Sequence, residues 1–366
     1  MSAPFPSSGL PHGEITVEVY GRSDVGRTRE HNEDAFALAD LTAGTVMLAA
    51  EPQVYRLGER GLLFMVADGM GGAAAGELAS AMAVDVVLEE LRNRWMSVSR
   101  KDPEAFATAL RASTEVANLK IHRFAGDHPE HRGMGTTATI AGLLGDRLYL
   151  VQVGDSRAYL VRDGVARQIT KDQSLMQKLI EAGEITAEEA EHSERRNIIL
   201  QALGPEAIIR TDLTHQHIRH GDTLVLCSDG LSGQMRVEDI AYAIAADRNL
   251  TSACARLIDL ANNNGGPDNI TVVAARFEGP GLVDAIADDT VGHTVYPLAD
   301  ERTPAVPIGR FMGGAPMRET PPRVAALNPT PAILPASADR RTPVILALGL
   351  VALVTLAIVA YRFVVT

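Results

Sequence analysis

Alternating apolar and polar positions open the patterned part of the chain. Ile15, Val17 and Val19 lie on one face of a period-two pattern, which predicts a β-strand. The run GLLFMVAD is typical of a buried strand, and GELASAMAVDVVLEELRNRW has apolar residues at helical spacing. A second helix is expected after Asp102 and Pro103, which suit the N-cap and the first helical turn.

The middle of the chain contains consecutive strand-like runs separated by tight turns. TTATIAGLLGDRLYLVQVGDSRAYLVRDGVARQIT predicts three or four strands joined at GD, GDS and DG turns. Short connections of this kind join antiparallel strands. Further strands are expected in DTLVLCSDG and NITVVAARF, with helices near VEDIAYAIAA and SACARLIDLANN. Residues 14–278 are therefore predicted to form one α+β domain.

Three segments depart from this alternation of strands and helices. Residues 1–13 have no basic stretch followed by an apolar run, so we expect a flexible N-terminus and no signal peptide. The stretch at about 173–204 is helical in pattern but strongly charged, which predicts a surface flap. Residues 279–341 are rich in Pro, Ala, Thr and Arg without periodicity, which predicts a disordered linker.

The last segment, 342–362, is apolar and predicts a transmembrane helix. It has no charge between Arg341 and Arg362, and about 20 apolar residues suffice to cross a bilayer. The competing interpretation is a buried core helix, but this run is apolar on every face and follows a linker. Asp339, Arg340 and Arg341 precede the span, which favours a cytoplasmic N-terminal side. We expect a single-pass protein of the cell membrane with its folded domain in the cytoplasm.

Composition narrows the class of protein. The hydrophobic fraction of 46% and the charged fraction of 22% are ordinary for a globular protein. A net charge of −12 argues against nucleic-acid binding and suits divalent cations. The two cysteines, Cys227 and Cys254, have no CxxC spacing, which excludes zinc and disulfide frameworks and indicates a reducing compartment. Both are expected to be buried as small hydrophobic residues.

Several aspartates stand where a strand-like run starts or stops. They are Asp34, Asp68, Asp155, Asp229 and Asp268. One Asp-Gly pair alone would most simply be a turn. Antiparallel connections can bring strand ends to one edge of a sheet, so the whole set predicts a cluster of carboxylates. Mg²⁺ and Mn²⁺ take such oxygen ligands and keep several waters. In Asp68-Gly69, the glycine would let a backbone carbonyl approach a metal closely.

Seven segments, in this order, resemble the metal-dependent protein phosphatases of the 2C type, the PPM family, in its bacterial form. They are GRTREHNEDAF, VADGMGG, GTTATIAG, VGDSRAYL, TKDQSL, CSDGL and GGPDNITVV. The resemblance covers roughly 15–277 and implies a sandwich of two antiparallel β-sheets flanked by helices. It also implies hydrolysis of phosphoserine and phosphothreonine in proteins, including Ser/Thr kinases and their substrates. Selectivity among substrates is expected to lie in the flap.

The resemblance implies a role for each matching acidic residue. Asp68 matches the aspartate that bridges two metal ions, and Gly69 matches the residue whose carbonyl binds one of them. Asp229 and Asp268 match the remaining carboxylate ligands. Asp155 matches an aspartate that, with Asp229, binds a weaker third ion.

Three further residues near the N-terminus match the family's site. Glu33 and Asp34 match an acidic pair that holds metal-bound waters. Arg29 matches the arginine that grips the substrate phosphate, a task for its forked donors. Two Mn²⁺ or Mg²⁺ ions about 4 Å apart would lower the pKa of a bridging water and supply hydroxide for in-line attack on phosphorus. Met70 occupies a position where some members have a histidine as a candidate general acid, which leaves the acid open.

Rival interpretations rest on weaker patterns. DGMGGAAAG resembles a phosphate-binding loop of a nucleotide enzyme, but its spacing is not GxGxxG and no GxxxxGK[ST] occurs. A catalytically inactive phosphoprotein-binding module would not need every metal-ligand position to be filled, as it is here. His215, His217 and His220 in HQHIRH match no ligand position of the family, and we interpret them and His31 as structural.

Overall fold

The computed structural model describes residues 13–46, 52–286 and 289–298. The chain divides into two units, Met1–Ala305 and Val306–Thr366, and every described residue belongs to the first unit.

The predicted membrane anchor lies outside the described residues. Within the described residues, no helix has both the length and the apolar character that crossing a bilayer requires. The predicted span at 342–362 and residues 299–341 of the predicted linker lie outside the described part of the chain. So does the predicted flexible N-terminus, apart from Gly13.

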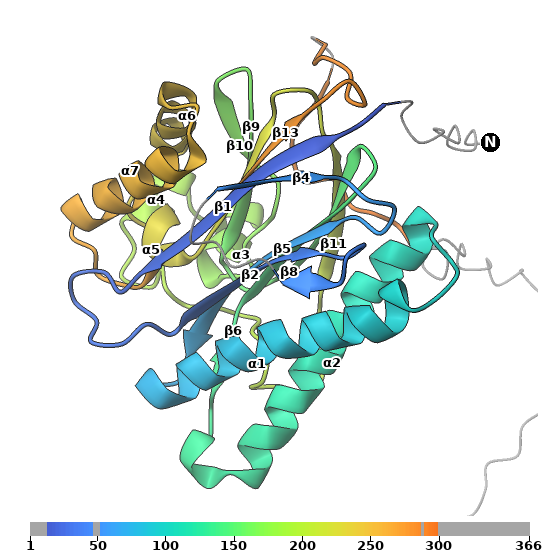
Figure 1. The fold of residues 1–366 in the computed structure, drawn as a ribbon. Coiled ribbons are helices and arrows are strands. Elements are labelled where there is room, and N and C mark those ends of the chain that lie inside the picture. The colour runs from blue at the N-terminus through green and yellow to red at the C-terminus, as the bar shows by residue number, and fades with distance from the viewer. Residues whose placement is uncertain (1–12, 47–51, 287–288, 299–366) are drawn as a thin grey trace, which may run out of the picture. The chain divides into compact units, whose positions relative to one another are not determined.

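Two antiparallel sheets lie face to face at the centre of the unit (Figure 1). The six-stranded sheet runs β10 (Val165–Gln168), β9 (Arg157–Arg162), β12 (Thr223–Cys227), β13 (Ile270–Glu278), β1 (Thr16–Asp24) and β4 (Gln53–Arg56). The seven-stranded sheet runs β11 (Asp212–His217), β8 (Arg147–Val153), β7 (Ala138–Leu144), β5 (Leu62–Met70), β2 (Asp34–Asp40) and β3 (Thr45–Val46), with β6 (Gly135–Thr136) paired to β5.

Every strand pair within the two sheets is antiparallel. Dinucleotide-binding folds need parallel strands joined by crossover helices. The rival interpretation of DGMGGAAAG as a nucleotide-binding loop is therefore wrong.

Helices cover the outer faces of both sheets (Figure 1). On the seven-stranded sheet lie α1 (Ala73–Leu91), extended by a π-helical turn at Arg92–Met96, and α2 (Pro103–Asp127), followed by a short 3₁₀ turn at Pro129–His131. On the six-stranded sheet lie α6 (Val237–Ala246) and α7 (Leu250–Asn263). The remaining helices are the short α3 (Leu175–Glu181), α4 (Ala187–Glu191) and α5 (Asp229–Ser232). The result is the predicted helix–sheet–sheet–helix sandwich.

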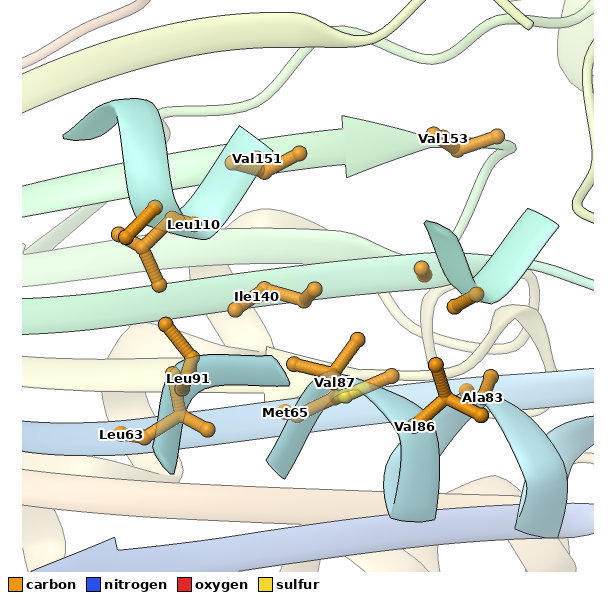
Figure 2. Packing of buried hydrophobic residues seen from close by; sticks show 14 of the residues in the cluster. Leu63, Met65, Ala83, Val86, Val87, Leu91, Leu110, Ile140, Val151 and Val153 are labelled. Atoms are coloured by element: carbon orange, nitrogen blue, oxygen red, sulfur yellow. The ribbon is translucent and has the colours of Figure 1, made fainter. Parts of the chain in front are cut away.

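Three layers of buried apolar residues hold the sandwich together. Val17 and Val19 of β1 pack between the sheets against residues such as Phe64 of β5, which confirms the predicted period-two face. A second layer separates the seven-stranded sheet from its helices, where Val87 of α1 lies over Met65 of β5 (Figure 2). A third layer, which includes both cysteines, lies under α6 and α7. Each sheet therefore buries both faces.

The predicted start of the second helix is confirmed. Asp102 is the N-cap of α2, and its carboxylate accepts a hydrogen bond of 3.0 Å from the backbone N–H of Ala105. Pro103 occupies the first turn, where its missing N–H leaves no helical hydrogen bond unmade. The cap fixes where α2 begins to cross the sheet.

The folded part extends beyond the boundary predicted at 278. Residues 281–286 and 289–298, here called the strap, run back to β11, where Tyr296 N donates to Leu213 O at 2.9 Å and His215 N donates to Thr294 O at 2.9 Å. Tyr296 and Leu298 are buried in the layer beneath α2. The linker predicted to start at 279 is thus corrected: sparse apolar anchors bind this stretch to a sheet edge, although it lacks a periodic pattern.

Candidate metal centre

The five aspartates predicted at strand ends come together at one end of the sandwich. Asp34 opens β2 and is the cross-strand partner of Asp68 near the end of β5. Asp229 follows β12, Asp268 precedes β13, and Asp155 lies in the turn between β8 and β9. Because β9, β12 and β13 are neighbours in one sheet, these three residues share its edge. Burial raises the pKa of Asp68, and repulsion by each of the other four carboxylates adds to the effect.

Burial dominates the electrostatics of this cluster. It raises the pKa of Asp34 to about 7, with repulsion from Asp229 and Asp268 adding to the effect and hydrogen bonds from Thr271 and Ser228 opposing it. Burial and then repulsion by Asp229 raise the pKa of Asp155 to about 7. Burial also raises the pKa values of Asp68 and Asp229, and repulsion by other carboxylates of the cluster adds to the effect. Without a counter-cation, the cluster resists full ionisation at neutral pH.

The donor set fits divalent cations. Buried oxygens of Asp34, Asp155 and Asp229 have no hydrogen-bond partner among the described residues. An unpartnered buried carboxylate oxygen is costly, and a cation would satisfy it. Among the described residues, no group of three or more His, Cys, Asp or Glu side chains is placed so that it could hold a metal ion. Mg²⁺ and Mn²⁺ retain several waters, so few direct carboxylate contacts are needed.

Gly69 lies where no side chain fits. A Cβ there would lie 2.3 Å from the Gly76 carbonyl oxygen of α1 and 2.5 Å from that of Glu33. The Gly69 N–H donates to the same Glu33 carbonyl at 3.2 Å. The absence of a side chain thus lets the end of β5, the start of α1 and the residue before β2 pack together next to Asp68.

The GTT motif fixes the backbone of Asp68. Its N–H donates to Thr137 Oγ1 at 3.0 Å, and its carbonyl accepts from Thr136 Oγ1 at 2.9 Å. Thr137 in turn contacts Ser156 Oγ at 2.7 Å, one residue after Asp155. Two of the clustered aspartates are therefore positioned through one pair of hydroxyls.

Hydrogen bonds from three residues that sequence reasoning missed orient the acidic pair Glu33 and Asp34. Asn269 Oδ1 accepts from the Glu33 N–H at 2.8 Å. Thr271 Oγ1 and Ser228 Oγ donate to Asp34 Oδ2 at 2.6 and 2.8 Å. The available signal was their position: Asn269 directly follows Asp268, and Ser228 directly precedes Asp229.

Arg29 reaches the edge of the cluster from the loop between β1 and β2. Its side chain is 48% exposed, and its Nη2 donates to Asp268 Oδ2 at 2.7 Å. The residue predicted to grip phosphate is thus held by a residue predicted to bind metal. Half-exposure leaves part of the guanidinium accessible from solvent.

The histidines of HQHIRH do not join this cluster. His217 lies 3.4 Å from Asp146 and His220 lies 2.8 Å from Glu278. These contacts are at the opposite ends of β8 and β13 from Asp155 and Asp268. Burial lowers the pKa of His215 to about 4, which keeps that ring neutral. Their interpretation as structural residues agrees with these contacts. Met70 ends β5 opposite Gly135 of β6.

The predicted flap is attached directly beside Asp155. Gln173 N donates to Gly154 O at 2.8 Å, and Gly154 N donates to Gln173 Oε1 at 3.1 Å. The chain closes the flap where Leu200 N donates to Gln173 O at 2.8 Å. Between these points lie α3 and α4, the latter opened by a capping box of Thr186 and Glu189.

Comparison with known proteins identifies the family of this chain. A sequence model described as protein phosphatase 2C matches residues 53–266. The chain is 34% identical over 252 residues to the serine/threonine phosphatase stp of Listeria monocytogenes, covering 69% of this chain and 92% of that protein. It is 38% identical over 262 residues to the serine/threonine protein phosphatase PstP of Mycobacterium tuberculosis, covering 71% of this chain and 45% of that longer protein.

Solved structures give the same result. The serine/threonine phosphatase of S. agalactiae superposes with a TM-score of 0.62 at 32% identity, covering 71% of this chain and 98% of that one. The catalytic domain of PstP in complex with two manganese ions superposes with a TM-score of 0.58 at 36% identity, covering 72% and 99%.

The sandwich of two antiparallel sheets is thus the fold of a protein phosphatase. The chain belongs to the protein phosphatase 2C family. It is a protein serine/threonine phosphatase.

Proposed function

We propose that this enzyme hydrolyses phosphoserine and phosphothreonine esters in proteins at a centre of two Mn²⁺ or Mg²⁺ ions, with a third ion held more weakly. The observation that carries the proposal is the aspartate cluster, whose buried, unpartnered oxygens and raised pKa values call for divalent cations. The two manganese ions in the crystal structure of the PstP catalytic domain support it.

The cluster suggests how the ions would be held. Asp68 would bridge the two ions, because it is the member that the other carboxylates surround. The Gly69 carbonyl, Asp229 and Asp268 would complete the direct ligands. Asp155, beside Asp229, would contribute to the third position. When bound, such ions activate a water for attack on phosphorus and neutralise charge on the phosphoryl oxygens.

The chain's own residues would orient the water and the phosphate. Glu33 and Asp34 would hold waters at the centre, with Asp34 kept in place by its two hydroxyl donors. Arg29 would bind the phosphoryl oxygens through the part of its guanidinium left free by Asp268. Phosphoryl transfer depends mainly on such positioning and charge stabilisation. Met70 has no proton to donate, so the leaving alkoxide would take its proton from water.

A comparison of turnover tests this proposal. The wild-type enzyme with Mn²⁺ should hydrolyse para-nitrophenyl phosphate and a phosphothreonine peptide, and Asp68→Asn should reduce kcat by about 100-fold or more. Gly126→Ala, on the exposed face of α2, is the control. If wild type and Asp68→Asn are equally inactive with excess Mn²⁺, the chain is instead a phosphoprotein-binding module.

We further propose a single-pass anchor in the cell membrane, with the catalytic domain in the cytoplasm. Its support is the sequence alone: the apolar run at 342–362, which has no charge before Arg362. Such tethering would favour substrates at the membrane, including Ser/Thr kinases located there. Cell fractionation tests it, since the full chain should sediment with membranes and a form ending at Leu298 should remain in the supernatant. Release of the full chain by high salt would contradict a membrane-spanning anchor.

A further inference from the structure

The flap contains a small pocket that the aspartate cluster does not use. Its volume is about 320 Å³, at the lower end of the range of ligand pockets, about 300–1,000 Å³. The lining residues are Met176, Leu179, Ile185, Glu189, Ser193, Glu194 and Arg195. The three apolar members are buried or half-buried, whereas the charged members are exposed. The pocket thus has an apolar interior and a charged rim, with room for one or two side chains.

Glutamates outnumber arginines in the stretch that contains most of the lining residues. The stretch 181–196 has six glutamates and two arginines: Glu181, Glu184, Glu188, Glu189, Glu191, Glu194, Arg195 and Arg196. Glu189 is committed to the capping box with Thr186. Glu194 has no hydrogen bond or ion pair with any residue in the described part of the chain. It is therefore available to a basic group of a partner.

The flap links this pocket to the catalytic centre. The pocket wall begins at Met176, three residues after Gln173, which is hydrogen-bonded to Gly154 beside Asp155. A protein segment whose phosphoryl group lies at the aspartate cluster would pass close to the flap. The same segment could then place a second side chain in the pocket.

We propose that the pocket binds an apolar side chain of the phosphoprotein substrate, with an adjacent Lys or Arg of the substrate paired to Glu194. This inference rests on the proposed function and adds its substrate class: phosphoproteins with a neighbouring apolar–basic pair. Apolar burial favours a leucine, isoleucine or methionine in the interior, and the excess of carboxylates favours a cationic neighbour. Among the lining residues, two carboxylates, Glu189 and Glu194, outnumber the one cation, Arg195.

A peptide series tests the substrate preference. Phosphothreonine peptides carry a Leu-Arg pair that is moved stepwise away from the phosphothreonine on either side, and the reference peptide has Ala-Ala instead. At one spacing, kcat/KM should exceed that of the reference by about tenfold. The excess should shrink as ionic strength increases, because the rim pair is exposed to solvent.

Flap variants locate the effect. Glu194→Lys should abolish the preference for arginine, while Glu191→Lys, an equal charge change outside the pocket lining, should retain it. Leu179→Ala should abolish the preference for leucine, while Leu200→Ala, an exposed apolar residue outside the lining, should retain it. All four variants should hydrolyse para-nitrophenyl phosphate at the wild-type rate, which shows that the metal centre is intact.

The outcomes separate this inference from the proposed function. Equal kcat/KM for every peptide, with active enzyme, would overturn the pocket proposal and leave the phosphatase proposal standing. Equal losses for Glu194→Lys and Glu191→Lys would also overturn it, because general attraction to the flap would then explain the preference. Failure to hydrolyse any phosphopeptide or para-nitrophenyl phosphate would instead overturn the proposed function.

Discussion

At the scale of single residues, hydroxyl groups control the carboxylates of this enzyme as much as neighbouring charges do. Thr271 is fully buried, and its hydroxyl donates to Asp34 Oδ2 at 2.6 Å. The same hydroxyl lies 2.7 Å from Ser23 Oγ. The hydrogen bonds from Thr271 and Ser228 favour the ionised form of Asp34, whereas its burial favours the protonated form. Cation binding requires the ionised form, so the hydroxyls prepare the ligand.

Thr271→Val should therefore weaken both folding and metal activation. The change keeps the shape but leaves Asp34 with one hydroxyl donor, and the free energy of unfolding should fall by about 1–3 kcal/mol. The Mn²⁺ concentration for half-maximal activity should rise, as measured by titration against para-nitrophenyl phosphate. Thr271→Ser keeps the donor and should resemble wild type. An unchanged Mn²⁺ titration for Thr271→Val would show that this hydroxyl does not prepare Asp34.

Two glycine substitutions separate crowding from ordinary helix propensity. Gly69→Ala would bring a methyl group to 2.3 Å from the Gly76 carbonyl oxygen, so backbone next to Asp68 must move. We expect a lower melting temperature and a large loss of turnover.

Gly126→Ala, with open space around its Cβ in α2, should raise the free energy of unfolding by about 0.5–1 kcal/mol. Thermal melts and kinetic assays measure both, and a fully active Gly69→Ala enzyme would contradict the prediction.

At the scale of elements, local patterns identified the strands and helices but not the long-range contacts between them. Strand-end aspartates were recognisable because Asp interrupts an apolar run, as Asp68 and Asp229 do. The supporting roles of Ser228 and Thr271 were not, because they depend on β12 and β13 lying beside Asp34, which is 194 and 237 positions away. The strap was missed because Leu282, Tyr296 and Leu298 are too sparse to form a period.

The strap should be required for a stable fold. A form ending at Glu278 exposes the edge of β11 and removes buried Tyr296 and Leu298, so it should unfold at a lower temperature and aggregate more readily. A form ending at Leu298 should have the same melting temperature, within error, as the folded domain of the full chain. Leu298→Ala in that longer form should cost about 2–5 kcal/mol in urea unfolding. Equal stability of the two truncated forms would show that the strap contributes no stability.

At the scale of the whole molecule, the centre stores electrostatic repulsion that its cations would relieve. The chain carries a net charge of −12, and one end of the sandwich gathers five aspartates, of which Asp155 is buried and the other four are partly buried. Folding is therefore in conflict with full ionisation of the cluster. Metal binding and stability should consequently be linked, and their linkage should depend on pH.

The sign of this linkage follows from Asp34 and Asp155. Their pKa is raised from 3.8 to about 7 in the metal-free fold, so the folded state binds more protons than the unfolded state between these values. Their contribution to stability is complete below about pH 4 and is lost as the pH rises through 7. In EDTA, the melting temperature should thus carry a component that falls between about pH 5 and pH 8, and Asp34→Asn should reduce that component. Added Mn²⁺ should raise the free energy of unfolding by about 2.7 kcal/mol at a hundredfold excess over its Kd. This gain should be larger at pH 8 than at pH 5, because at low pH the cation must displace protons from the aspartates. Calorimetry across this range measures both effects. A Mn²⁺ stabilisation that does not grow with pH would mean that the aspartates are already ionised in the metal-free fold, and the buried, mutually repelling cluster would then not be what drives cation binding.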